Sequence, residues 1–282
     1  MKSKNKIFSF DIETIPNLHA GRVLLGMEGE KDDDIVHSAL TQYHIDNANG
    51  NSFLRQPFWS VACISYIEAD CIEDRDGIWY QVSNIKSAGD VKSSEKDLIL
   101  GFSNYCLKNR PRLVTFNGKI FDIPVLKYRA MYYEIQFSWF YQQTSQYDKG
   151  YADKWGDKDN FDLIDFYKPA SGGLKMSELC SAFGIPAKTT TNGSQVYDMY
   201  KDGKISEIRN YCEEDALATF ILFVISEYHK GLINKDGYEK SLISLFKKID
   251  EDRILHLIDF VKLAKQSPIL GKFIDIKNDS LL

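Results

Sequence analysis

The stretch "IFSFDIETIP", residues 7–16, places two carboxylates in a run that is otherwise typical of a buried β-strand. Successive strand residues point to opposite faces, so Asp11 and Glu13 share one face while Phe10 and Ile12 share the other. Neighbouring carboxylates repel each other, and burial makes their ionised forms costly. Either the strand ends in solvent here, which is the simpler interpretation of these residues alone, or a divalent cation compensates the charge.

The bulk composition is that of an ordinary soluble globular protein, with one large domain or a domain and an appendage. The 282 residues are 44% hydrophobic and 27% charged, which supplies enough apolar material for a substantial core. The net charge of −5 argues against a protein that simply coats a nucleic-acid backbone. It leaves open an enzyme with a local basic groove.

The cysteines and the N-terminus favour an intracellular protein. The five cysteines form no CxxC pair, and their odd number predicts neither a zinc site nor a disulfide framework, so we expect reduced thiols. The segment "MKSKNK" leads directly into the first strand without the apolar core of a signal peptide. No apolar run is long enough to span a membrane. We therefore expect a cytoplasmic location.

Hydrophobic periodicity and turn signals predict a mixed α/β protein. Strands are expected at about residues 5–13, 58–69, 78–84, 112–116 and 160–167. Helices are expected at about residues 32–45, 93–109, 121–135, 175–184 and 205–228, with more in 231–282. An antiparallel three-stranded meander followed by alternating helices and parallel strands is the order of the ribonuclease H-like fold. We expect one domain over residues 1–230, interrupted by an insertion at 17–56, and a C-terminal helical extension over 231–282.

Two further stretches place acids where elements meet. In "TFNGKIFDIPVL", Asp122 follows a strand and a turn at the start of a helix, where a carboxylate also caps the helix for about 1 kcal/mol. In "IRNYCEEDALATF", Tyr211 and Asp215 are four residues apart and share a helix face. We expect the intervening Glu213 and Glu214 to be solvated. Each signal alone also fits an ordinary cap or surface pair.

Together the three stretches resemble a known set of motifs. "FDIET", "FNGKIFD" and "YCEED" are similar, in order and in residue types, to the three motifs of the DEDD superfamily of 3′–5′ exonucleases. Tyr211 before Asp215 matches the subgroup that carries tyrosine in the third motif. Over about residues 5–228, further segments such as "NGKIFDIPVLKYRA" and "MSELCSAFGIPAK" resemble stand-alone bacterial proteins related to the proofreading domain of family B DNA polymerases.

The resemblance implies a metal-dependent enzyme that removes nucleotides from the 3′ end of a single strand, of DNA in preference to RNA. In such enzymes four acids hold two divalent ions about 3.5–4 Å apart. Carried over by motif, these metal ligands are Asp11, Glu13, Asp122 and Asp215, with Asp11 expected to bridge the ions. Mg²⁺ or Mn²⁺ suits such oxygen ligands. Tyr211 is implied to orient the attacking water.

Five more residues are candidates for substrate binding. Ile12 and Phe121 would line a pocket for the terminal nucleotide, although core packing explains them equally well. Asn117 would contact the strand end or simply shape its turn. Lys188 and Ser194 fall where the resembled family has a lysine and a Gly-Ser loop, which suggests phosphate contacts, although Ser194 also fits a solvated surface.

Two alternatives to the exonuclease remain at this point. One is a nucleic-acid-binding or interaction module that kept the fold and lost the chemistry, which the complete motif set argues against. The other is a ribonuclease H-like endonuclease. Tyr211 argues against it, because the third motif of those relatives usually has an acid without this tyrosine. The chain carries no polymerase segment, so proofreading would need a polymerase partner, and repair, with a repair partner, or nucleic-acid turnover is equally open.

Overall fold

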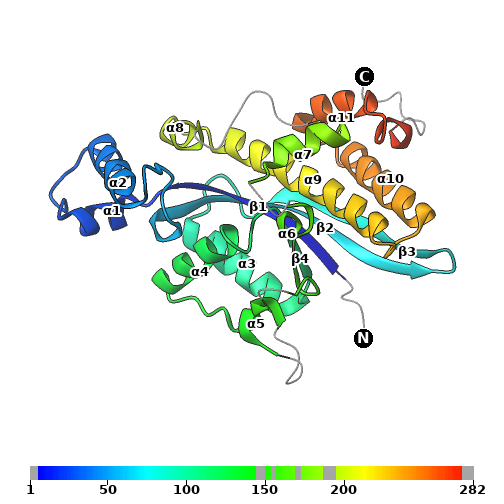
Figure 1. The fold of residues 1–282 in the computed structure, drawn as a ribbon, viewed down its shortest axis with the longest axis horizontal. Helices are drawn as coiled ribbons and strands as arrows, with labels where there is room; N and C mark the ends of the chain where they lie inside the picture. The colour runs from blue at the N-terminus through cyan, green and yellow to red at the C-terminus, as the bar shows by residue number, and fades with distance from the viewer. Residues whose placement is uncertain (1–5, 144–149, 154–155, 169–172, 187–194, 275–282) are drawn as a thin grey trace.

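A mixed five-stranded sheet forms the centre of the protein (Figure 1). The computed structural model describes residues 6–143, 150–153, 156–168, 173–186 and 195–274. Within them the strand order is β3-β2-β1-β4-β5. The strands are β1 Lys6–Pro16, β2 Trp59–Asp74, β3 Gly77–Ser87, β4 Arg112–Thr115 and β5 Asn160–Asp162. The first three strands pair antiparallel and the last two run parallel to β1, so the predicted ribonuclease H-like fold is confirmed.

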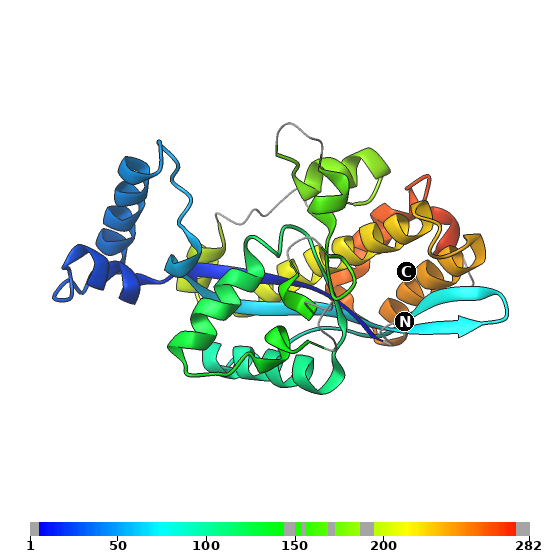
Figure 2. The same cartoon turned by 60° about the horizontal axis from the view of Figure 1, so that its bottom comes forward.

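Helices cover both faces of the sheet (Figures 1 and 2). One face packs against α3, α4 and α5, and the other against α7, α9 and α10. The longer helices are α2 Asp33–Asn47, α3 Glu95–Asn109, α4 Asp122–Tyr132, α9 Ile205–His229 and α10 Lys235–Glu251. The shorter ones are α1 Leu18–Leu25, α5 Ser138–Tyr141, α6 Leu163–Tyr167, α7 Met176–Phe183, α8 Val196–Lys201 and α11 Ile258–Lys265, and single 3₁₀ turns are η1 Gln56–Phe58, η2 Gly150–Ala152, η4 Leu255–Leu257 and η5 Gly271–Phe273.

Local signals account for most helix boundaries. Ser94 caps α3 in a reciprocal capping box with Asp97, as the serines in this stretch predict. Pro124 lies in the first turn of α4, where its missing N–H costs nothing. Gly184 ends α7 in the left-handed conformation, with φ of 65°. Residues close in the sequence therefore set most helix boundaries.

Two predicted elements differ from the structure. The predicted strand at 160–167 is a strand only over Asn160–Asp162, and α6 replaces its second half because the Asp162 side chain accepts the N–H of Ile164 and caps a helix there. The insertion at 17–56 holds α1 as well as the predicted α2. This pair of helices projects from the end of β1 (Figure 1).

The C-terminal part of the chain protects an exposed edge of the sheet. β3 is an edge strand, so the N–H groups on its outer side need partners outside the sheet. Ser241 and Ser244 of α10 accept the N–H groups of Tyr80 and Val82, each at 2.9 Å. Behind them the apolar side chains of α10, which include Leu242 and Leu245, are buried. α10 therefore packs on the same sheet as the helices that precede it.

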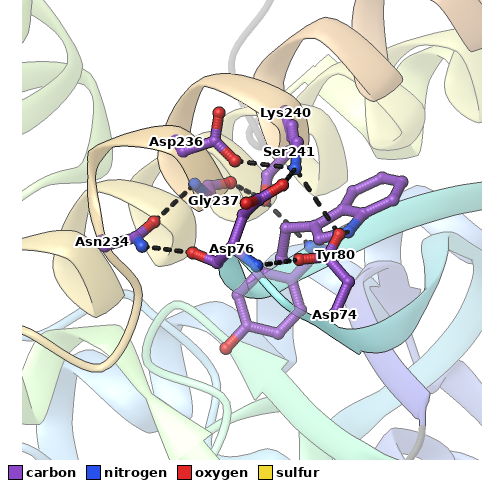
Figure 3. Close-up of polar contacts among 9 residues, drawn as sticks. Asp74, Asp76, Tyr80, Asn234, Asp236, Gly237, Lys240 and Ser241 are labelled. Atoms are coloured by element: carbon purple, nitrogen blue, oxygen red, sulfur yellow. Dashed lines mark hydrogen bonds and ion pairs between the residues drawn. The ribbon is translucent and has the colours of Figure 1, made fainter.

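Polar contacts fasten the tip of the β2–β3 hairpin to the start of α10 (Figure 3). Lys240 pairs with Asp236 at 2.7 Å and with Asp76 at 3.2 Å. Asn234 caps α10 by accepting the N–H of Gly237 at 2.8 Å. A Cβ atom on Gly237 would lie 2.1 Å from the carbonyl oxygen of Ile78, so only glycine permits this approach.

The helices in the described part of the chain are all too short or too polar to cross a membrane. The five cysteines are free thiols, as the sequence predicts, and they are Cys63, Cys71, Cys106, Cys180 and Cys212.

We predict that Ser241→Ala lowers the free energy of unfolding by about 1–3 kcal/mol, because the buried N–H of Tyr80 loses its acceptor. Urea denaturation measures this loss. Ser181→Ala is the matched control, since both serines donate to the carbonyl four residues earlier but only Ser241 also receives a strand N–H. A control loss as large as that of Ser241→Ala would contradict the importance of the edge contact.

Candidate active site

Asp11 and Glu13 lie toward the end of β1 on the face that α9 covers. Glu13 is buried and Asp11 is half-buried. On the same face, the Ser9 hydroxyl donates to the carbonyl oxygen of Ala216 in α9, at 3.4 Å. Phe10 points to the opposite face and packs in the core beneath α3 and α4. The predicted alternation along β1 is therefore correct, and the carboxylates face a helix rather than open solvent.

The pairing of β1 with β2 changes register directly after the acidic pair. Glu13 lies opposite Cys63, but Thr14 lies opposite Val61, so Ala62 is the extra residue of a β-bulge. A bulge bends the strand and redirects side chains, and bulges are common beside active sites. Here the bulge places the side chains of Val61 and Cys63 on opposite faces of the sheet, beside the carboxylates.

Asp122 reaches β1 from the start of α4. Its Oδ1 accepts the backbone N–H of Ile12, the residue between the two acids, at 3.2 Å. The side chain is buried. Burial, with the Asp162 carboxylate adding to it, raises the pKa of Asp122 to about 7 despite the backbone N–H groups that it accepts. The second acidic stretch therefore meets the first in an environment that disfavours further negative charge.

Asp162 holds the loop that carries Asp122, and the sequence analysis did not identify it. Its carboxylate accepts the backbone N–H groups of Asn117 at 2.6 Å and Lys119 at 2.9 Å, and it caps α6 through Ile164. Asp162 is buried, and burial raises its pKa. The available signal was an acid at the end of a short strand, but the apolar residues after it favoured a longer strand.

The third acidic stretch lies on α9, over the same part of β1. The thiol of Cys212 donates to the carbonyl oxygen of Asp11 at 3.3 Å and lies 3.7 Å from its Oδ2. Among the described residues, Asp11, Glu13 and Cys212 bring one ligand atom each within 4.8 Å of one another. Tyr211 precedes Cys212, and Asp215 follows about one helical turn after Tyr211.

Tyr211 lies in the field of these acids. Burial raises the pKa of its hydroxyl well above its usual value, and the carboxylates of Asp215, Glu13 and Asp11 raise it further, in that order. The phenol therefore keeps its proton across the physiological range. It is a hydrogen-bond donor rather than a base.

Glu213 is buried rather than solvated, so that prediction was wrong. The Ser87 hydroxyl donates to its Oε1 at 2.7 Å, and Nε2 of His256 lies 3.0 Å from its Oε2. Burial by itself raises the pKa of Glu213, but the contacts with His256 and Ser87 outweigh it and lower the pKa. Glu213 thereby joins α9 to the hairpin and to the C-terminal helices. Local spacing on α9 could not reveal partners so distant in the sequence.

The donor set suits a hard divalent cation. Asp11 and Glu13 supply carboxylate oxygens side by side, and Asp122 brings a buried carboxylate to the residue between them. Burial, together with the neighbouring thiol of Cys63, raises the pKa of Cys212, so its sulfur stays protonated and acts as a donor to Asp11. The oxygen atoms, rather than the sulfur, are the available ligands.

The five predicted substrate-binding residues are placed differently. The Ile12 side chain lies in the core, and its backbone N–H holds Asp122. Asn117 adopts a left-handed φ of 68° and so shapes the turn before α4. Phe121 is half-buried at the N-terminus of α4. Lys188 and Ser194 lie outside the described residues.

Comparison with known proteins identifies the family. Residues 51–264 match the model of a family described as a predicted 3′–5′ exonuclease related to the exonuclease domain of PolB. The chain belongs to this family. The match includes Asp122, Tyr211 and Asp215, whereas Asp11 and Glu13 precede it on the other side of the insertion. A search of curated proteins found no match.

We predict that Asp122→Asn stabilises the metal-free protein at pH 8 more than at pH 5. The folded protein holds the Asp122 proton up to about pH 7, whereas an ordinary aspartate has a pKa of 3.8. Stability of the wild type therefore falls as the pH rises between these values, and asparagine avoids the loss. Melting in EDTA should show an advantage for the variant of at least about 2 °C at pH 8.

Asp259→Asn serves as the control for this measurement because its side chain is 88% exposed. Its difference from the wild type should not change between the two pH values. An Asp122→Asn advantage that is equal at both values would show that Asp122 does not ionise in this range.

Proposed function

We propose that the protein is a divalent-metal-dependent 3′–5′ exonuclease that acts on single-stranded nucleic acid, DNA in preference to RNA. Membership in the exonuclease family supports the reaction class. The observation that carries the proposal is the meeting of three distant stretches on one short piece of β1. Asp122 bonds to Ile12, and Cys212, which follows Tyr211, bonds to Asp11.

We propose that Asp11, Glu13, Asp122 and Asp215 are the metal ligands. Together they would hold two ions of Mg²⁺ or Mn²⁺. Bound ions of this kind lower the pKa of water and neutralise charge that develops on the phosphate. The chain's own part is to fix the carboxylates before substrate arrives. Asp122 is held by Ile12, and the Cys212 thiol restrains Asp11. Such preorganisation avoids reorientation during the reaction.

We assign to Tyr211 the orientation of the attacking water. Its raised pKa keeps the hydroxyl protonated, so it can donate a hydrogen bond to a phosphate oxygen or align a water. It does not remove the proton itself. Its position on α9, among the carboxylates of Asp215, Glu13 and Asp11, suits this role.

An aromatic cluster beside Asp122 supports binding of unpaired bases. Phe121 directly precedes Asp122, and its ring centroid lies 5.5 Å from that of Phe53 and 6.2 Å from that of Trp59. Phe53 comes from the insertion, and 54% of its surface is exposed. Exposed rings accept stacked bases of any sequence. We propose that this cluster, which we call the aromatic platform, holds bases near the 3′ end.

Electrostatic binding by the described residues near Asp122 is limited. The ammonium of Lys119 is engaged by Asp165 at 3.0 Å and by the carbonyl oxygen of Gly156 at 3.0 Å. With a net charge of −5, the protein offers little long-range attraction for phosphate. We therefore expect stacking and bound metal to dominate binding of nucleic acid.

We predict stepwise shortening of a 5′-labelled single-stranded DNA in Mg²⁺ or Mn²⁺, and no shortening in EDTA. Asp11→Asn and Asp215→Asn should each lower the rate by at least about a hundredfold, because the transition state loses charge stabilisation. Denaturing gels of time courses measure this. Asp202→Asn, whose side chain is 60% exposed, should retain activity.

Three outcomes would contradict the proposal. Internal cuts on a 3′-blocked or circular single strand would indicate an endonuclease. Binding without cleavage in either metal would indicate a binding module. Faster degradation of a matched RNA than of the DNA would overturn the substrate preference alone.

We predict that Phe53→Ala weakens binding of a single strand whose 3′ linkages are phosphorothioates, because one stacking surface is removed. Stacking contributes about 1–3 kcal/mol per base, so Kd by fluorescence anisotropy should rise at least about fivefold. Tyr228→Ala is the control, since Tyr228 is an exposed aromatic residue about 25 Å along α9 from Tyr211. Equal effects of the two variants would exclude a specific platform.

A further inference from the structure

An open groove of about 370 Å³ lies between α10 and the C-terminal segment η4–α11–η5. Its volume is within the range of binding pockets in proteins. The proposed nuclease chemistry does not use it, because all of its lining residues lie in 243–274. We call it the C-terminal groove.

The walls of the C-terminal groove are aliphatic and partly exposed. They are formed by Ile243, Ile254, Ile258, Val261 and Ile274. The deeper positions, including Phe246 and Phe273, are buried. Partly exposed aliphatic walls above a buried floor are suited to receiving apolar side chains.

The rim of the groove is basic, in contrast to the net charge of −5 for the chain. Four cations and one anion line it, and they are Lys247, Arg253, Lys262, Lys265 and Asp250. Among the residues that the structure describes, Lys247 and Lys262 pair only with exposed acids on their own helices, Glu251 and Asp259. Such pairs are weak and exchange readily. Within the described residues, Arg253 and Lys265 have no ion-pair partner.

Arg253 takes an unusual backbone conformation at this rim. It follows α10 with φ of 50°, in the left-handed region where glycine is favoured. A side chain in this conformation costs about 1–2 kcal/mol. The Arg253 side chain places a cation beside the groove.

We propose that the C-terminal groove binds an acidic peptide segment of a partner protein, with apolar side chains inserted between α10 and α11. Charge complementarity selects the acidic segment, and the aliphatic walls select its apolar anchors. The cations are spread along both helices, which suits a chain with several carboxylates better than a single lipid headgroup. The two aromatic rings of the lining are buried, so bases find no stacking surface. This inference does not depend on the proposed nuclease activity.

The test selects random twelve-residue peptides displayed on phage against the full-length protein. The expected result is enrichment of peptides that combine several Asp or Glu with two or more large apolar residues. The best peptide, labelled with fluorescein, is then titrated by anisotropy. Arg253→Glu combined with Lys265→Glu should raise its Kd at least tenfold, and Ile258→Glu should do the same.

The matched control reverses two exposed cations on the other side of the sheet, Lys96→Glu with Lys108→Glu in α3, and should change Kd less than twofold. The proposal is overturned if no acidic-apolar peptide is enriched, or if the Arg253–Lys265 variant binds equally well. It is also overturned if binding requires truncation after Ile274, which would make the chain's own last residues the occupant. Displacement by single-stranded DNA, or a dimer that the same charge reversal dissociates, would overturn it in favour of those occupants.

Discussion

The hydrogen bond from the backbone N–H of Ile12 to Oδ1 of Asp122 joins the two halves of the candidate site. It places a buried carboxylate against the strand residue that separates Asp11 from Glu13. Because charge in such a place is costly, the site is stable without metal only if some of its acids remain protonated. The raised pKa of Asp122 expresses this constraint. The cation binding that we propose would offset this repulsion between buried carboxylates.

Residues around the site hold its carboxylates close together. Asp162 fixes the loop before Asp122, and the thiol of Cys212 fixes Asp11. Farther out, Glu213 ties α9 to Ser87, and α10 closes the edge of β3. The C-terminal helices thus contribute to the framework of the fold. They also form an apolar groove with a basic rim, which the proposed nuclease chemistry does not use.

Elements with strong local signals were predicted well. The alternation around Asp11 and Glu13 gave their common face, and the helices expected at 121–135 and 175–184 match α4 and α7 closely. Two predictions failed for different reasons. The second half of the strand expected at 160–167 is α6, because Asp162 caps a helix there although the apolar residues that follow favour a strand. Glu213 is buried because Ser87 of β3 and His256 of η4, both distant in the sequence, contact its carboxylate.

By itself the sequence determined the strand and helix periods, the residue types of the acidic stretches and their family resemblance, since these depend on neighbours along the chain. Only the tertiary structure decided which groups meet: that Asp122 bonds to Ile12, that a protonated thiol backs Asp11, and that serines of α10 cap β3. Such contacts join residues more than 100 positions apart, and they depend on packing geometry that no local pattern contains.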